Sequence, residues 1–300
     1  MASPILRRLT WPRLLQPLRQ GQFALLWTGQ TISRLGDGAY QAVLTWTVYA
    51  ISGSAADAGY VLMAASIPQL VLLLAGGVIG DRFPRRSVIL LSDTLSGLTI
   101  GAAAVLAAAG HLTVPALLIL SAIFGTLSAF FLPAYGPLIP EIVPQDRLQA
   151  VNSLQAVTFS TTQIIGPSLG AALYALGRAT AAFGFDALTF FVAAGASLAL
   201  RIPGQPARMR NSDWADVREG WDYLRRTTWL WLSITLAGVY HVVSGALFLV
   251  LLPLVLRHLH LGVAYMGITS CVSSSWSVPI RWLVHAGYPA SWWELRPHIP

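Results

Sequence analysis

The sequence predicts an all-α membrane protein, and two observations point to that class. Charged side chains make up 10% of the 300 residues and apolar side chains 55%, with a mean hydropathy of +0.62. A soluble domain usually carries about 25% charged residues, and a disordered chain is much less apolar than this one. Asp, Glu, Lys and Arg are also absent from four long runs, residues 58–80, 94–140, 148–177 and 227–256. Because about 20 apolar residues cross a bilayer, each run can hold at least one transmembrane helix.

Seven transmembrane helices fit between the charged residues. The run over 94–140 is long enough for two helices, and residues 110–115 at its centre indicate the turn between them. The only long polar stretch, residues 201–227, separates the sixth helix from the seventh. The predicted helices cover residues 22–50, 57–79, 86–109, 115–138, 149–176, 180–200 and 228–256.

The distribution of arginine predicts how the chain is oriented. All nineteen cationic residues are Arg, and the net charge is +7. Binding to nucleic acid would require this charge to form a basic face on a folded domain. Instead, fourteen Arg lie in the 1–21 tail and in alternate loops, whereas the opposite loops hold only Arg178 and Arg257. Since cytoplasmic loops are rich in basic residues, we expect a multi-pass cell-membrane protein with a cytoplasmic N-terminus and no nucleic-acid partner.

Four charged residues fall inside the predicted spans. Arg34 and Asp37 lie three residues apart, so they share one helix face and can pair. Asp93 lies about two turns into its span, and Asp186 lies near the outer end of the sixth. Each charge costs a few kcal/mol at the bilayer centre unless it is paired or hydrated. Two interpretations stay open: a proton or cation relay lining a central cavity, or structural contacts between neighbouring helices.

Three amide side chains add to the polar groups within the spans. Gln30 and Gln41 flank the Arg34–Asp37 pair, and Gln163 lies in the middle of the fifth span. An uncharged amide can bind a substrate in a cavity, and it can equally bridge two helices.

The same spans offer little for enzyme chemistry. The single cysteine, Cys271, excludes a disulfide framework and a Cys-based metal cluster. Within the spans, no Ser or Cys nucleophile lies beside a His. We therefore expect no enzymatic activity, no metal and no cofactor.

A short charged segment over residues 77–86 follows the second span. It contains two glycines, one acid and three arginines, and a generic basic loop would explain the arginines but not their order. Gly77 allows the helix to approach a neighbour closely, and Asp81 can pair with Arg or accept hydrogen bonds from a helix N-terminus.

This segment resembles the loop signature of the major facilitator superfamily. The matching residues are Gly77, Asp81, Arg82, Arg85 and Arg86, and Pro84 replaces the glycine of the broad pattern. The order Asp-Arg-Phe-Pro-Arg-Arg is similar to the branch of macrolide and siderophore exporters. Residues 29–37, 131–152 and 186–190 resemble the same branch, so the resemblance covers roughly residues 15–268.

The fifth span resembles part of the superfamily's antiporter motif. Gly166, Pro167 and Gly170 match it, whereas Thr162 stands where the motif has a glycine. Pro167 is expected to kink the helix and Gly170 to allow close packing. An Arg that many proton antiporters carry in the fourth span is absent from this sequence.

The resemblance implies a six-helix bundle of the major facilitator type over residues 22–200, after a cytoplasmic tail over 1–21. A cytoplasmic linker over 201–227 leads to the start of a second bundle, 228–268, with the seventh helix and a possible degenerate eighth. Two such bundles enclose a central site and work by alternating access. The implied function is proton-coupled efflux of an amphipathic small molecule of the drug or siderophore class, with Asp37 and Arg34 as the coupling or substrate contacts. The loop residues 77–86 would form a conformational gate.

Beyond residue 268 the resemblance ends. Residues 269–300 contain four of the eleven Trp and the only Cys, with several Ser, and they predict no clear span. We hypothesise a frameshifted or truncated reading frame, with a divergent eighth helix as the alternative. A non-transporting membrane polypeptide, either a relic or an interaction subunit, therefore stays open as a second function, and the oligomeric state is not indicated.

Overall fold

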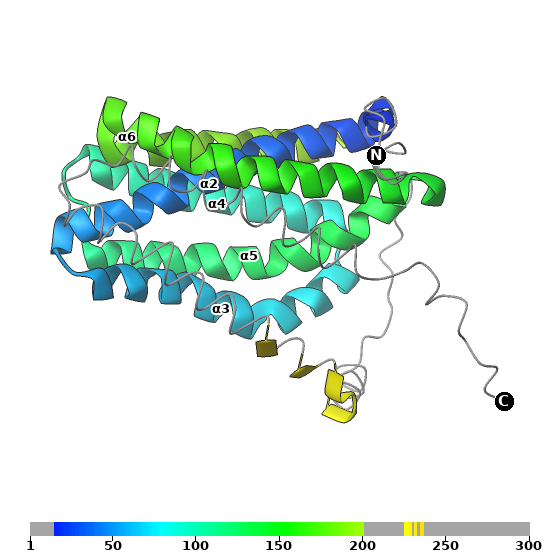
Figure 1. Ribbon diagram of the computed structural model, residues 1–300, viewed down its shortest axis with the longest axis horizontal. Coiled ribbons are helices and arrows are strands. Elements are labelled where there is room, and N and C mark those ends of the chain that lie inside the picture. Colours follow the sequence, from blue (N-terminus) through cyan, green and yellow to red (C-terminus); the bar gives the residue numbers. More distant parts are fainter. Residues whose placement is uncertain (1–14, 201–224, 230, 233–234, 237–300) are drawn as a thin grey trace, which may run out of the picture.

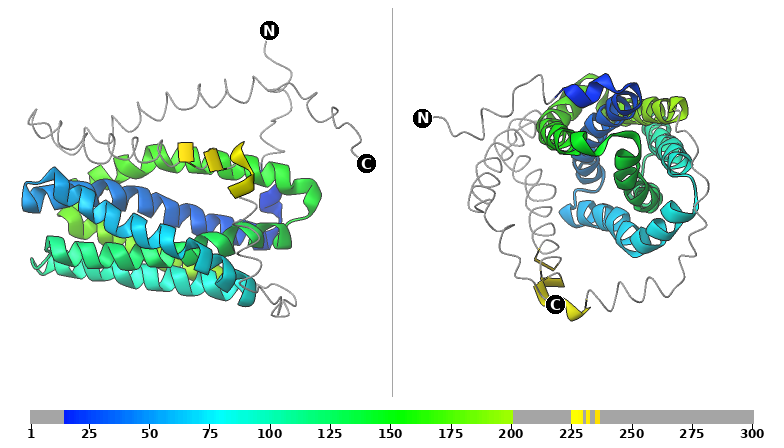
Figure 2. Two further views of the ribbon diagram at one scale, coloured as in Figure 1. Left: turned by 90° about the horizontal axis from the view of Figure 1, so that it is seen from below. Right: turned by 90° about the vertical axis from the view of Figure 1, so that its right-hand side faces the viewer.

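The computed structural model describes residues 15–200, 225–229, 231–232 and 235–236. These residues form only helices, turns and connections, which confirms the all-α class. The predictions for the linker, the start of the second bundle and the 269–300 tail lie almost entirely outside the described residues. The helices are η2 (Gln16–Arg19), α2 (Gly21–Ser52), α3 (Ala55–Arg82), α4 (Arg85–Ala108), α5 (Val114–Ile142), η3 (Gln145–Arg147) and α6 (Leu148–Ala199). Figure 1 shows the long helices running side by side along one axis, and the end-on view in Figure 2 shows them packed as a bundle.

Turn residues at one end of this bundle separate consecutive helices. Gly53 and Gly110 adopt φ values of 70° and 71°, a left-handed conformation that glycine adopts without strain. Ser54 and Thr113 then cap the next helices, because their hydroxyls accept hydrogen bonds from the backbone N–H groups of Asp57 and Ala116. Each connection therefore stops one long helix and starts the next within a few residues.

The helix α6 contains two of the predicted spans, 149–176 and 180–200, joined at a non-helical turn. Gly177 and Arg178 depart from helical geometry, and Arg178 has a φ of 54°. Before the turn, Trp27 contacts Thr158 and Gly38 contacts Gly166, so α2 and α6 run parallel. After the turn, Gly29 lies against Ala196 whereas Gly36 lies against Asp186, so the direction has reversed. The two parts of α6 thus pass α2 in opposite directions.

Four segments are long and apolar enough to cross a membrane: Ala55–Leu73, Arg85–Ala108, Val114–Ile142 and Gln145–Ala199. The helix α2 is long enough as well, but Arg34, Asp37 and many polar side chains lower its hydropathy. With these apolar helices the chain is a multi-pass membrane protein.

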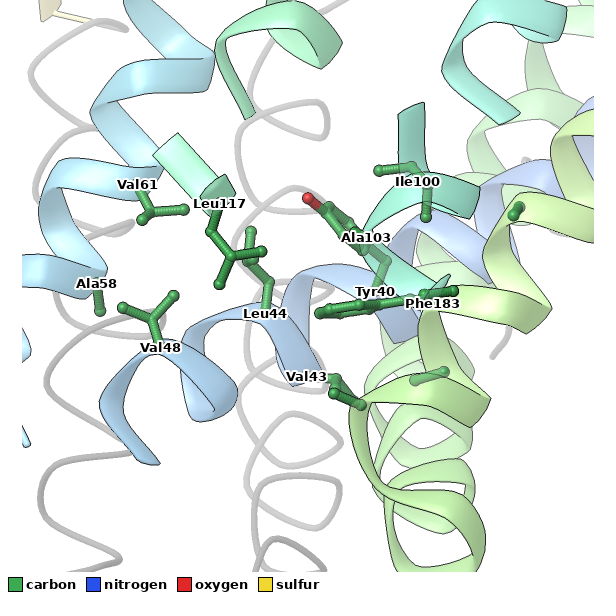
Figure 3. Close-up of a cluster of buried hydrophobic side chains, with 14 of the residues drawn as sticks. Tyr40, Val43, Leu44, Val48, Ala58, Val61, Ile100, Ala103, Leu117 and Phe183 are labelled. Carbon is green, nitrogen blue, oxygen red and sulfur yellow. The ribbon is translucent and has the colours of Figure 1, made fainter. Parts of the chain in front are cut away.

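Two groups of buried apolar side chains hold the bundle together. The first centres on Tyr40, Val43, Ile100 and Phe183, which come from α2, α4 and α6 and lie together in Figure 3. The second centres on Phe23, Ile89, Leu138 and Val151 near the other end of the helices. Polar residues lie between and beside these groups, and there the helices leave a cavity.

Candidate functional site

A cavity of about 400 Å³ lies among α2, α3, α4, α5 and α6. Its size suits a small molecule, since such sites usually measure about 300–1,000 Å³. Exposed Gln41, Leu132, Phe159 and Gln163 belong to its wall, so it opens at the surface of the bundle. Six of the seven residues predicted for substrate or proton coupling line it: Gln30, Arg34, Asp37, Gln41, Asp93 and Gln163.

Arg34 and Asp37 lie on the cavity face of α2, but their side chains do not pair. Among the described residues, no ion pair within 4.0 Å joins them. The Arg34 guanidinium lies over the Tyr135 ring instead, with its central carbon 5.4 Å from the ring centroid, which is within cation–π range. The Oδ1 atom of Asp37 is buried and has no hydrogen-bond partner among the described residues.

Asp93 of α4 is tied to α2 by one hydrogen bond. The Gln30 amide donates from Nε2 to Asp93 Oδ2 at 2.9 Å, and both side chains are buried. The bond spans two helices, as an amide bridge in a membrane does. This contact therefore joins a predicted acid and a predicted amide, and both still reach the cavity wall.

Asp186 is the one predicted acid that lies outside the cavity wall. Its side chain is completely buried between α6 and α2, where the Thr189 hydroxyl lies 2.7 Å from the Asp186 carbonyl oxygen and 3.3 Å from Oδ1, so the two oxygens share one donor. Its other oxygen, Oδ2, lacks a hydrogen-bond partner among the described residues. Gly36 gives it room, because a Cβ atom at Gly36 would lie 3.2 Å from the Asp186 Cα and closer still to its carboxylate.

Sequence reasoning missed the aromatic and hydroxyl side chains of the wall. Ser121, Phe124, Ser128 and Phe131 follow one another along α5 at spacings of three and four residues, and all four line the cavity. That spacing marks one face of a helix and could have been recognised. These four residues lie in the uncharged run 94–140, where no charged side chain indicates a polar site. The remaining unpredicted aromatic, hydroxyl and amide side chains of the wall are Tyr40, Phe159, Phe190, Ser33, Ser92, Ser96, Thr162 and Gln69.

The loop residues 77–86 lie at the end of the bundle where α3 ends and α4 begins. The Arg85 guanidinium donates to the Pro137 carbonyl at 3.1 Å and forms an ion pair with Glu141, so it holds α4 against α5. Arg86 donates to the Ser197 carbonyl at 2.9 Å and to that of Leu198. These carbonyls belong to the last turn of α6 and have no partner within the helix.

The other residues of this loop occupy the end of α3 and its turn. Gly77 lies in open space, since an added Cβ would meet nothing within 4 Å, whereas Gly80 packs near Pro133. Arg82 is exposed and ends α3. The gating role of Gly77, Asp81, Arg82, Arg85 and Arg86 stays a prediction.

Gly166 and Gly170 bring α6 into backbone contact with α2. A Cβ at Gly166 would lie 2.8 Å from the Gly38 Cα, and one at Gly170 would lie 2.6 Å from the Ala39 carbonyl oxygen. Larger residues could not pack here, in accordance with the rule that small residues let membrane helices approach. Pro167 lies between them inside α6, and the kink expected there stays a prediction.

Comparison with known proteins identifies the relatives of this chain. A family model described as transmembrane secretion effector matches residues 13–269. The uncharacterised MFS-type transporter YfiS of Bacillus subtilis is 30% identical over 182 residues, which cover 60% of this chain and 42% of that protein. The multidrug efflux pump Tap of Mycolicibacterium fortuitum is 31% identical over 163 residues, covering 52% and 40%. Macrolide efflux protein A of Streptococcus pyogenes is 24% identical over 222 residues, covering 73% and 55%. The chain spans about half the length of these relatives.

Proposed function

The chain belongs to the transmembrane secretion effector family of major facilitator transporters, and from that membership we propose that it exports amphipathic small molecules from the cell in exchange for protons. The cavity carries this proposal. It places two carboxylates, one guanidinium and several amides against aromatic and aliphatic side chains. A molecule with an apolar body and a polar group fits such a lining, because few but specific polar contacts orient a ligand in an apolar site.

Alternating access is the mechanism we propose, and the position of the cavity supports it. The rim side chains Gln41, Leu132 and Phe159 border the cavity and are exposed, as expected for a face that a second bundle contacts. In this mechanism a second bundle covers such a face and rocks against the first, which opens the site to each side in turn.

Asp37 is the residue we propose to couple transport to proton movement. An ionised carboxylate inside the membrane has an unfavourable free energy unless it is paired or hydrated. A ligand or a proton that neutralises it therefore binds more tightly, because binding relieves a large part of that unfavourable free energy. Asp37 is such a costly carboxylate, since it lacks an ion pair with Arg34 and one of its oxygens has no hydrogen-bond partner among the described residues. Asp93 and Asp186 are the next candidates.

The loop after α3 is proposed as the conformational gate. Arg85 and Arg86 fix the start of α4 to the ends of α5 and α6, and Asp81 and Arg82 lie a few residues before this firmly held segment in the chain. Arg82, Arg85, Arg86 and Arg147 lie at the same end, which supports a cytoplasmic location for this end and for the N-terminus.

An efflux assay on the full chain tests the proposed function. Cells that express it should accumulate less of a fluorescent amphipathic drug, and a protonophore should abolish the difference. Asp37→Asn should lower efflux by about tenfold or more at unchanged expression, because it removes a titratable group and leaves its volume nearly constant. Asp146→Asn is the matched control, since Asp146 lies outside the cavity and is exposed.

Two outcomes would contradict the proposal. Full, gradient-dependent efflux by Asp37→Asn would remove Asp37 from the mechanism. Absence of efflux from cells that express the unaltered chain at a measurable level would favour a non-transporting membrane polypeptide.

A further inference from the structure

We propose that one part of the cavity is a subsite for an organic cation, formed by the Asp37 carboxylate and the rings of Tyr40, Phe124 and Phe190. The inference rests on the proposed function, because it names the chemical class of the molecule that the cavity takes. It makes Phe124 and Phe190 specificity-determining residues, a role that neither the charge pattern nor the family signature assigns to them.

The rings come from three helices and lie against one another at steep angles. The ring centroids of Phe124 of α5 and Tyr40 of α2 lie 5.8 Å apart, with 52° between the ring planes. The Phe124 ring lies 5.8 Å from that of Phe190 of α6 as well, at 75°. All three rings line the cavity. Tyr40 also packs against Phe183, with 5.2 Å between the ring centroids. Because the rings are tilted, at least one of them can present its face to a ligand, as in the aromatic sites that bind quaternary ammonium groups.

Asp37 supplies the charge that such a site needs. It precedes Tyr40 by one helical turn on α2, so its carboxylate and this ring share one face of the helix. No ion pair among the described residues satisfies it, and its Oδ1 atom has no hydrogen-bond partner there. A cation that binds beside the rings would therefore meet a carboxylate that has no ion-pair partner among the described residues.

The other charges of the wall reinforce this preference. Asp93 is the second acid, and it is already hydrogen-bonded to Gln30. Arg34 is the single cation of the wall, and its guanidinium is directed at Tyr135, a ring outside the group formed by Tyr40, Phe124 and Phe190. An anion at the subsite would face two carboxylates, whereas a cation of the same shape would be attracted to both. The cavity is thus expected to distinguish ligands by the sign of their charge.

The alternative is that these rings only fill the core. In that case the cavity would bind apolar ions of either sign equally well, and removal of a ring would weaken both by the same factor. Two ions of nearly identical size and shape, tetraphenylphosphonium and tetraphenylborate, separate the two possibilities.

The experiment measures saturable binding of each ion to the purified full chain in detergent, with excess unlabelled ion to define the background. We expect the cation to bind about tenfold more tightly than the anion, as a charge-assisted contact provides. Asp37→Asn should remove this preference. Phe124→Leu should weaken cation binding by about threefold to tenfold and should not weaken anion binding, because the negative face of the ring attracts only the cation. Phe191→Leu is the control, since Phe191 follows Phe190 on α6 but is exposed and lies outside the cavity wall.

Equal binding of the two ions, or an unchanged preference in Asp37→Asn, would overturn the inference. The conservative Asp37→Asn exchange keeps it testable if Phe124→Leu does not fold. Binding and transport can fail separately. Selective binding without efflux would contradict the proposed function alone, and efflux that favours the anion would contradict the cation subsite alone.

Discussion

The bundle differs between its arginine-rich end and its centre in how its charged side chains are paired. The arginine-rich end is defined by Arg82, Arg85, Arg86 and Arg147. At this end Arg85 pairs with Glu141 and Arg86 binds the free carbonyls of the last turn of α6. At the centre, Asp37 and Asp186 each keep one oxygen without a hydrogen-bond partner among the described residues.

This difference separates structural charges from functional ones. A charge that is paired at a helix end stabilises the fold with little desolvation penalty, because both water and the helix carbonyls solvate it. A buried charge without a partner destabilises the fold, so the chain keeps it only if a ligand or a proton completes it. Removal of a charged side chain should therefore lower the stability of the fold at the arginine-rich end and leave it unchanged or raise it at the centre. The predictions below are ordered from the largest expected effect on stability to the smallest.

Gly36→Val should have the largest effect, because it closes the space in which Asp186 is held. The added side chain would overlap the Asp186 carboxylate and the Thr189 hydroxyl, and the α2–α6 contact would have to open. Overpacking of this kind costs about 3 kcal/mol. Thermal unfolding in detergent should show a lower transition, and size-exclusion chromatography a lower yield of monodisperse protein. Gly184→Val is the control, since nothing lies within 4 Å of a Cβ there; equal losses in both variants would contradict the packing argument.

Arg86→Ala should destabilise the arginine-rich end. It removes two hydrogen bonds from a charged donor, so the Ser197 and Leu198 carbonyls lose the guanidinium as their partner. Hydrogen bonds to charged groups contribute about 1.5–3 kcal/mol, and because the site is partly exposed we expect a loss near the lower value. The measurement is the same thermal transition. Arg147→Ala, a change at an exposed arginine of the same end, should leave it in place. A stable Arg86→Ala protein would show that the contact does not hold α6.

The helices could be predicted well from the sequence, because the bilayer fixes their length. The span expected over 22–50 is Gly21–Ser52 in the structure, and the one expected over 86–109 is Arg85–Ala108. The uncharged runs 58–80 and 148–177 end near helix ends for the same physical reason, whereas the run 94–140 begins inside α4, after Asp93. The helix α5 continues to Ile142, beyond the expected end at residue 138, although Pro137 and Pro140 lie inside it.

The contacts of the site could be predicted only in part. Spacing along α2 places Arg34 and Asp37 on one face, but it cannot show that Tyr135 of another helix takes the guanidinium instead. The partner of Asp93 is Gln30, 63 residues away, and no local pattern links them. Asp186, like Asp37, is an acid inside a predicted span, yet it lies outside the cavity wall, because the rotation of a helix about its own axis depends on its neighbours.

Asp186→Asn should leave stability unchanged or raise it, the opposite sign to Arg86→Ala. The exchange removes a charge that has no cationic partner among the described residues, and the amide oxygen can still accept the hydrogen bond from Thr189. Replacing an uncompensated buried charge by a neutral group of equal volume is neutral or stabilising by about 1 kcal/mol. Asp186→Leu, which also removes the acceptor, should be less stable than Asp186→Asn. A large fall in the transition of Asp186→Asn would mean that the carboxylate has a partner after all, and the contrast between the two regions would weaken.

Glu141→Gln should have the smallest effect, although it breaks an ion pair. Both side chains of the pair are partly solvated, with exposed fractions of 20% for Arg85 and 32% for Glu141, so water compensates for much of the loss. Arg85 also keeps its hydrogen bond to the Pro137 carbonyl. Surface ion pairs contribute about 0.2–1 kcal/mol and are screened by salt, so the small difference from the unaltered protein should shrink further as salt is added. The same change in transition at low and high salt would show that Glu141 acts through packing.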